Sequence, residues 1–161
     1  MEIVSSWKYL GVVISDKMND SSDISRQIRG LYVQGNSIIR CFRHCTSDVK
    51  VLLFKTFCSS FYCPHLWSSF SAEYYRRLKV AYNRIFRYMF NVTEYNISIS
   101  GMMLDYNVKT FDAVIRNYIF SFIQRMSTCD NGIIKAVMNS VFYYSSIIFK
   151  HWKDKLYLLS D

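Results

Sequence analysis

Positively charged side chains concentrate in one stretch of the sequence, and phosphate binding is the chemistry that they could perform. Residues 26–90 contain eleven Lys and Arg against two acids, Asp48 and Glu73. Lys and Arg neutralise the phosphates of nucleic acids, and a field of one sign attracts a polyanion. Nucleic acid is therefore the first partner to test, ahead of a membrane surface.

Helical spacing places these cations on two exposed faces. One helix is expected from a cap at residues 21–23 to about Cys45, because apolar residues recur there in steps of three and four. Another is expected from a cap at Ser71 to about Phe90. In both, the cations fall opposite the apolar stripe. The predicted nucleic-acid-binding residues are Arg26, Arg29, Arg40 and Arg43 on the first helix, and Arg76, Arg77, Lys79, Arg84 and Arg87 on the second.

Cysteine and histidine residues near the ends of the first two expected helices form the one candidate metal site. Tetrahedral zinc needs four converging ligands, and their spacing matches none of the usual paired zinc motifs. We therefore expect small buried thiols and no metal ion or other cofactor in this chain. The residues concerned are Cys41, His44, Cys45, Cys58, Cys63 and His65.

Other motifs of catalysis are not found in the sequence. It contains no Gly-rich phosphate loop, no nucleophile elbow, no His-x-x-x-His helix and no polymerase-type carboxylate pair. Asp16, Asp20 and Asp23 lie in a turn region, where solvated turn and capping roles are expected. The chain is not expected to be an enzyme by itself.

The elements that position these residues are expected to be almost all helical. One strand is predicted at Trp7–Ser15, which is rich in aromatic and β-branched residues, and it lacks an obvious partner strand. The almost wholly apolar helix from Val49 to about Tyr62 should lie centrally, and a short helical turn is expected near 102–106. Two further helices are predicted at about Phe111–Met126 and Gly132–Trp152. The predicted fold class is mainly α, a helical bundle with a short N-terminal β-strand.

The expected location is intracellular, in the cytoplasm or nucleus. No basic segment followed by an apolar one opens the sequence as in a secretory signal. An odd number of cysteines, five, fits a reducing compartment. Residues 133–149 are interrupted by Lys135, Asn139 and serines, so we expect a core helix there and not a membrane span.

Several segments, in order along the chain, resemble the reverse transcriptases of non-LTR (LINE-type) retrotransposons. Residues 8–14 (KYLGVVI) are similar to the strand that closes the palm of these enzymes. Residues 53–62 (LFKTFCSSFY) and 65–67 (HLW) resemble the signature of the thumb region. The likeness continues at residues 78–87 (LKVAYNRIFR), 111–116 (FDAVIR), 120–123 (FSFI) and 150–152 (KHW).

The resemblance implies the palm end and thumb of such an enzyme. Residues 1–19 would be the end-of-palm strand and turn, 20–92 a basic thumb-like helical bundle, and 93–161 a C-terminal helical extension. The family's metal-binding aspartates lie upstream of these segments, so the resemblance implies a fragment of an RNA-directed DNA polymerase without its catalytic residues. The parent enzyme would use Mg²⁺. The implied partners are an RNA/DNA or DNA duplex, bound through its phosphates, and the upstream palm domain, with no membrane partner.

A different class of function stays open. The chain could be a noncatalytic helical module that binds itself or another protein through an apolar face, or a degenerate retroelement remnant. Such a module would keep its partner after charge reversal of both arginine faces, whereas a phosphate-binding protein would not.

Overall fold

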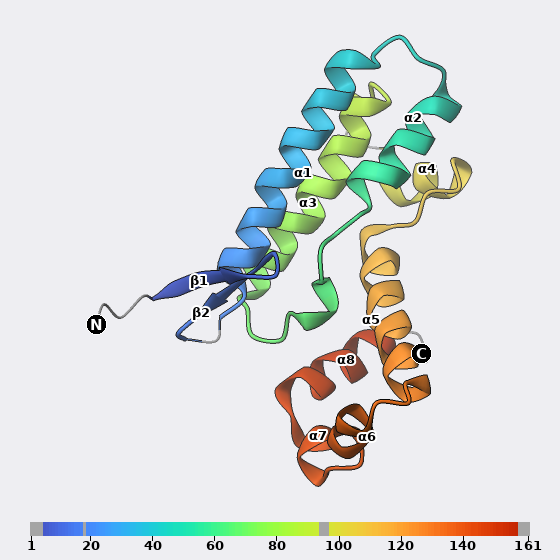
Figure 1. Cartoon of the computed structure of the whole chain (residues 1–161). Helices are drawn as coiled ribbons and strands as arrows, with labels where there is room; N and C mark the ends of the chain where they lie inside the picture. Colours follow the sequence, from blue (N-terminus) through green and yellow to red (C-terminus); the bar gives the residue numbers. More distant parts are fainter. Residues whose placement is uncertain (1–4, 18, 94–96, 158–161) are drawn as a thin grey trace.

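The computed structural model describes residues 5–17, 19–93 and 97–157, and it confirms a mainly α-helical fold with a small β-element at the N-terminal end (Figure 1). A π-helical turn, η1 (Phe54–Cys58), and a 3-10 turn, η2 (Pro64–Leu66), lie within the bundle. The predicted three-part division of the chain stays a prediction. The helices are α1 (Ser21–Cys41), α2 (Ser47–Leu53), α3 (Ala72–Met89), α4 (Ile99–Asp105), α5 (Phe111–Thr128), α6 (Gly132–Met138), α7 (Val141–Ser145) and α8 (Ile147–Tyr157).

The segment expected to be one strand folds as a β-hairpin. β1 (Ser6–Tyr9) pairs antiparallel with β2 (Val12–Ser15). The two residues between them, Leu10 and Gly11, have φ of 45° and 85°. Two successive positive φ values give a tight turn whose twist suits a hairpin. The segment therefore supplies its own partner strand, which the single-strand prediction missed.

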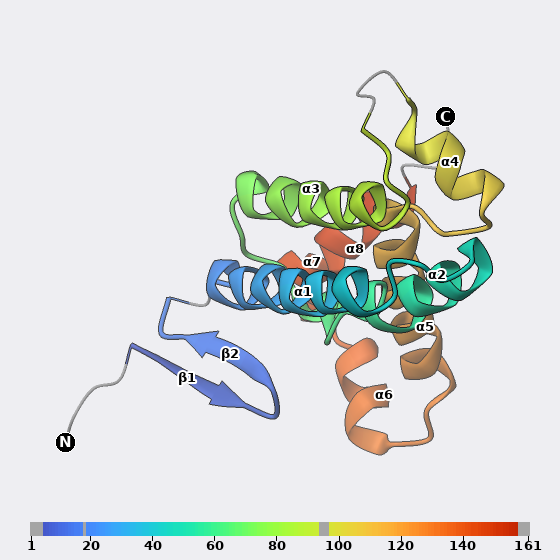
Figure 2. The same ribbon diagram turned by 90° about the horizontal axis from the view of Figure 1, so that it is seen from above.

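Helices α1 and α3 lie side by side and parallel at the centre of the bundle (Figures 1 and 2). Just before the two helices, the Asp20 backbone N–H donates to the Ser69 carbonyl at 2.8 Å. Midway along them, Gly35 of α1 lies directly against the Ile85 side chain of α3. The predicted apolar stripes face the core over most of both helices, but Phe42, expected in the first stripe, follows the end of α1 and is 40% exposed. The buried members are Ile24, Leu31, Gly35 and Ile38 on α1 and Leu78, Tyr82, Ile85 and Met89 on α3.

The helix expected from Val49 to Tyr62 is shorter and less central than its apolar sequence suggested. Regular helix ends at Leu53, and in the π-helical turn that follows the Ser59 N–H donates to the Phe54 carbonyl five residues back, at 3.1 Å. A π-turn takes up an extra residue and so changes which side chains face inward. Phe54 and Cys58 of η1 are buried, whereas Leu52 of α2 is 64% exposed.

Aromatic side chains join α3, η1 and α5 into one core. The ring of Tyr82 lies between those of Phe54 and Phe111, with centroid separations of 5.0 and 5.8 Å. The far end of the chain is tied to the same core, because Trp152 of α8 donates its indole N–H to the His65 carbonyl at 2.7 Å. This core holds α5 against α3 and fixes the side chains between them.

The single helix predicted at Gly132–Trp152 is wrong, since the chain forms α6, α7 and α8 there. Two serines account for the breaks. The Oγ of Ser140 accepts the Phe142 N–H, and the Oγ of Ser146 accepts the Phe149 N–H, both at 3.2 Å. A serine that satisfies free N–H groups in this way starts a new helix.

The same region is also less buried than a core helix would be. Tyr143 is buried, whereas Val141 and Phe142 are 83% and 82% exposed. No helix in the described part of the chain combines the length and the apolar character needed to cross a membrane.

Candidate nucleic-acid interface

Six of the nine predicted cations gather on one surface of the parallel helix pair, which we call the α1–α3 face. Arg29 and Arg40 are eleven residues apart and therefore point in directions only about 20° apart around α1. Arg43 follows the end of that helix, and Arg76, Arg77 and Arg84 belong to α3. All six side chains are exposed.

Two shallow hollows lie between the helices on this face. The hollow toward the helix starts has a volume of about 200 Å³, and the one toward the helix ends about 410 Å³. None of the described residues that line them carries a carboxylate. The first is lined by Ile28, Tyr32, Arg76, Arg77 and Val80, and the second by residues that include Asn36, Arg40, Arg43, Lys50, Tyr88 and Asn91.

Tyrosine side chains hold the exposed arginines of α3 in place. The Arg84 guanidinium lies 5.8 Å from the centre of the Tyr88 ring, and the Arg77 guanidinium lies 5.5 Å from that of Tyr74. A hydrogen bond to Tyr32 of α1, followed by interaction with Tyr88, raises the pKa of Arg84. Arg84 therefore spans the groove between the two helices and is charged at every relevant pH.

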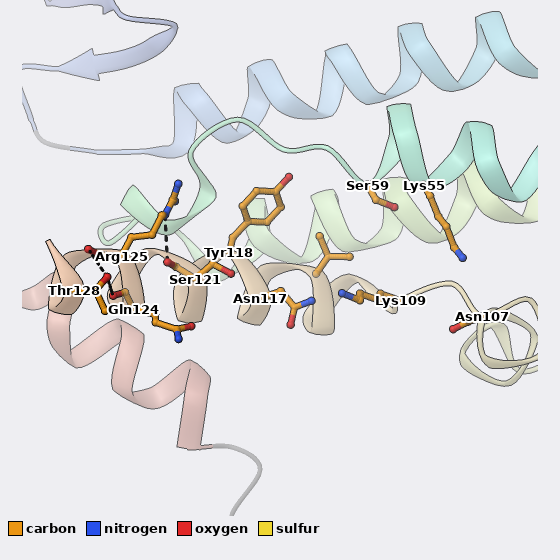
Figure 3. Close-up of a pocket in the computed structure, with 11 residues that line it drawn as sticks. Lys55, Ser59, Asn107, Lys109, Asn117, Tyr118, Ser121, Gln124, Arg125 and Thr128 are labelled. Carbon is orange, nitrogen blue, oxygen red and sulfur yellow. Dashed lines mark hydrogen bonds between the residues drawn. The ribbon is translucent and has the colours of Figure 1, made fainter.

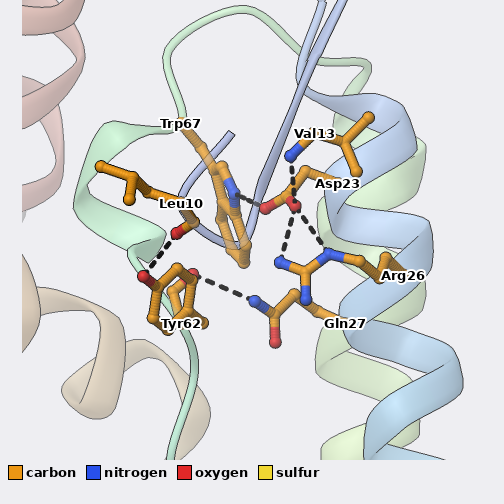
Figure 4. A network of polar contacts seen from close by, with 7 residues as sticks. All are labelled: Leu10, Val13, Asp23, Arg26, Gln27, Tyr62 and Trp67. Atoms are coloured by element: carbon orange, nitrogen blue, oxygen red, sulfur yellow. Dashed lines mark hydrogen bonds and ion pairs between the residues drawn. The ribbon is translucent and has the colours of Figure 1, made fainter. Parts of the chain in front are cut away.

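Arg26 belongs to a buried polar network on a different side of α1 (Figure 4). Its guanidinium donates to one oxygen of Asp23 at 2.9 and 2.7 Å, and the Val13 N–H donates to the same oxygen at 3.2 Å. The other oxygen accepts the Trp67 indole N–H at 3.0 Å. The solvated turn role expected for Asp23 is wrong, because its side chain is 0% exposed and joins the hairpin, α1 and the segment after η2.

Lys79 and Arg87 also have partners away from the α1–α3 face. The Lys79 ammonium pairs with Asp112 of α5. Arg87 donates to the Ile97 carbonyl at 3.2 Å. Both contacts link α3 to later parts of the chain, so an interface proposed for the α1–α3 face rests on the other cations.

Sequence reasoning missed several residues that contribute to this face. Lys50 lines the larger hollow from α2, and Tyr32 and Tyr88 line the two hollows from opposite helices. Nothing in the sequence shows that α1 and α3 are parallel neighbours. The residues that line the groove between them therefore could not be predicted as part of the interface. The one feature of the sequence that could have indicated such a residue is the position of Tyr32 at the edge of the apolar stripe of α1.

The cysteine and histidine residues form no metal centre among the described residues, where no group of three His, Cys, Asp or Glu side chains could hold an ion. Cys41 and His44 are exposed near the end of α1, and Cys58 is buried under the core. His65 stacks on Phe122 with ring centroids 4.1 Å apart. Burial, with a smaller effect of the Arg125 charge, lowers the pKa of His65.

Cys58 is expected to resist alkylation in the folded protein. Burial raises the pKa of its thiol to about 12, and only the thiolate reacts readily. Exposed Cys41 serves as the internal control, and it is expected to be labelled by iodoacetamide at mildly alkaline pH. Peptide mass spectrometry with and without urea measures both sites. Equal labelling of Cys41 and Cys58 without urea would contradict the burial described above.

The sequence matches no family model, and no significant match is found among curated proteins or among solved structures.

Proposed function

We propose that this chain binds a nucleic-acid duplex through its phosphates, as the thumb and C-terminal region of a retrotransposon-type reverse transcriptase. The observation that carries the proposal is the clustering of six exposed cations on the α1–α3 face. Two parallel helices with a shallow groove between them offer charges along a line, as a phosphate backbone requires. Contacts of this kind position a duplex without reading its bases.

The chemistry of the face supports phosphate binding. Arginine offers a planar fork of donors that matches phosphate oxygens, and the six arginines of the face are all exposed. The two hollows follow one another along the helix pair, so a polymer can lie along both. The ordered resemblance to the thumb of LINE-type enzymes supports the same function independently of the geometry.

On this proposal the chain does not polymerise DNA by itself, because the family's metal-binding aspartates would be supplied by an upstream palm domain. The parent enzyme would bring Mg²⁺ to that domain. The hairpin is the natural contact to the palm, because all four residues of β1 are exposed, including Trp7 and Tyr9.

Binding to an RNA/DNA hybrid is expected to fall steeply with salt and to depend on Arg40, Arg77 and Arg84. Changing these three to Glu should weaken binding about tenfold or more, and should lower the slope of log K against log salt by about 2 to 3. Fluorescence anisotropy across a salt series measures both quantities. Arg40→Glu, Arg77→Glu and Arg84→Glu leave the described core contacts intact, since none of the three side chains is buried.

The matched control carries Lys17→Glu, Lys135→Glu and Lys150→Glu, which make the same change in net charge at exposed positions off the α1–α3 face. It is expected to bind the hybrid nearly as tightly as the parent chain. An equal loss in both variants, or a flat response to salt, would contradict a phosphate-binding site on this face.

A second candidate function, a protein-interaction module, is favoured by the apolar surface of α7. Val141 and Phe142 project into solvent there, which is unusual for side chains with no partner to contact. If this function holds, the α1–α3 charge reversals will leave partner binding unchanged, whereas Val141→Ser with Phe142→Ser will abolish it.

A further inference from the structure

An open cleft of about 1000 Å³ lies between η1 and α5, apart from the α1–α3 face (Figure 3). Lys55 of η1 and Ser59, the residue directly after η1, line one side, and the rest of the lining comes from α5 and the segment before it. Val114 is the one aliphatic side chain among the lining residues. The others are Asn107, Lys109, Asn117, Tyr118, Ser121, Gln124, Arg125 and Thr128.

The lining is positively charged and rich in hydrogen-bonding groups. Lys55, Lys109 and Arg125 contribute three cations, and no described residue of the lining carries a carboxylate. None of the three forms an ion pair within the described part of the chain. A cleft lined by charges of one sign attracts ligands of the opposite sign, so these three cations suit an anionic ligand.

Buried hydrogen bonds fix the walls of the cleft before any ligand arrives. The hydroxyl of Tyr82, a core residue of α3, lies 3.1 Å from the Ser59 hydroxyl on one wall and donates to the Lys109 carbonyl on the other at 2.7 Å. Burial raises the pKa of Tyr82 to about 12, so the hydroxyl keeps its proton for this link. Lys55 and Ser59 are presented by a π-helical turn, a feature that is frequent at functional sites.

The cleft is long in one direction, which decides the kind of ligand. Its lining follows α5 from Lys109, just before the helix, to Arg125 and Thr128 near its end. The fourteen residue-to-residue steps from Phe111 to Arg125 rise about 21 Å at 1.5 Å per residue. A mononucleotide cannot reach both ends, whereas a strand of several nucleotides can.

We infer that this cleft binds a single-stranded segment of nucleic acid, as a second site distinct from the proposed duplex site. Lys55, Lys109 and Arg125 neutralise phosphates at different points along the strand, and the side-chain amides of the lining donate to and accept from base edges or sugars. Tyr118 offers a ring for stacking, as aromatic side chains do in single-strand binders. Tyr82 and Arg84 of α3 are two residues apart and point roughly 200° apart, so the cleft and the α1–α3 face use opposite sides of that helix.

A variant with Lys55→Glu, Lys109→Glu and Arg125→Glu tests the inference. Anisotropy with fluorescent twelve-residue oligo(dT) and oligo(U) is expected to show binding weakened about tenfold or more, with a reduced salt slope. The same variant should still bind the RNA/DNA hybrid, whereas the Arg40, Arg77 and Arg84 variant should lose the hybrid and keep the single strands. The control with Lys17, Lys135 and Lys150 changed to Glu should keep both ligands.

Each other outcome overturns the inference. Equal weakening of single-strand binding in the cleft variant and the control would mean that net charge alone is responsible. Equal competition by an acidic peptide, oligo-Glu, would show a site for polyanions in general. If circular dichroism shows that the Glu variant is unfolded, a variant with Gln at the same three positions replaces it in the binding experiment. Unchanged single-strand binding by the Gln variant overturns the inference. The two proposals can fail separately, because hybrid binding tests the α1–α3 face and single-strand binding tests the cleft.

Discussion

Gly35→Ala is expected to destabilise the protein by about 1 to 3 kcal/mol, the usual cost of an overpacked core. A Cβ at Gly35 would lie 2.6 Å from Cδ1 and 2.7 Å from Cγ2 of Ile85, distances that real Cβ atoms do not show. Ile85 is fully buried and branched at Cβ, so it has no free space to move into. The two helices must therefore separate, although alanine is the better helix former. Urea denaturation followed by circular dichroism measures the effect.

Gly30→Ala is the matched control on the same helix. Outside the backbone of its own helix and its two chain neighbours, no described atom lies within 4 Å of a Cβ at Gly30, which is exposed. The substitution should therefore stabilise the protein by about 0.5 to 1 kcal/mol through helix propensity alone. Adding Ile85→Val to Gly35→Ala removes one methyl group at the contact and should recover part of the loss. Stabilisation by both alanine substitutions would rule out close packing of α1 on α3 at Gly35.

Asp23→Ala is expected to cost about 1 to 3 kcal/mol, the effect of leaving buried donors without their acceptor. The substitution leaves the Arg26 guanidinium, the Trp67 indole N–H and the Val13 N–H without their acceptor. The loss should appear as a lower midpoint of urea unfolding. Because Trp67 is itself buried against this carboxylate, its fluorescence should shift to longer wavelength at lower urea in the variant.

Asp130→Ala controls for the loss of a negative charge. Asp130 pairs with Lys135 at 3.0 Å, but its side chain is 100% exposed, and exposed pairs of this kind contribute about 0 to 1 kcal/mol. Similar costs for Asp23→Ala and Asp130→Ala would mean that the Asp23 network contributes little to stability.

The long helices could be predicted from the sequence because their signals are local. The apolar residues of α1 and α3 recur every three or four positions, and Ser71 accepts the Glu73 N–H at 3.3 Å as a cap should. The hairpin escaped prediction because its turn places Leu10, not Asn or Asp, at the first residue with positive φ. The serines that begin α7 and α8 look the same in a sequence as serines on a helix surface.

The candidate site was predictable as a charge pattern and not as a set of contacts. Periodicity placed nine cations on exposed faces, but it could not show that Asp23, Asp112 and the Ile97 carbonyl would engage three of them. Those partners reach α1 and α3 through the tertiary structure, which periodicity in the sequence does not report. The cleft along α5 could not be predicted for the same reason. Its two walls lie about 50 residues apart in sequence, and periodicity reports only on residues within one helix or strand.

The parallel arrangement of α1 and α3 also shapes the electric field along the pair. Backbone dipoles give each helix a partial positive charge at its N-terminus and a partial negative charge at its C-terminus. Since the helices point the same way, both positive ends lie near Ser21 and Ala72, and both negative ends near Cys41 and Met89. Arg40 and Arg43 stand at the negative ends and offset them. The sequence thus adds side-chain charge where the backbone would repel a phosphate, and the pair is attractive to anions over its whole length.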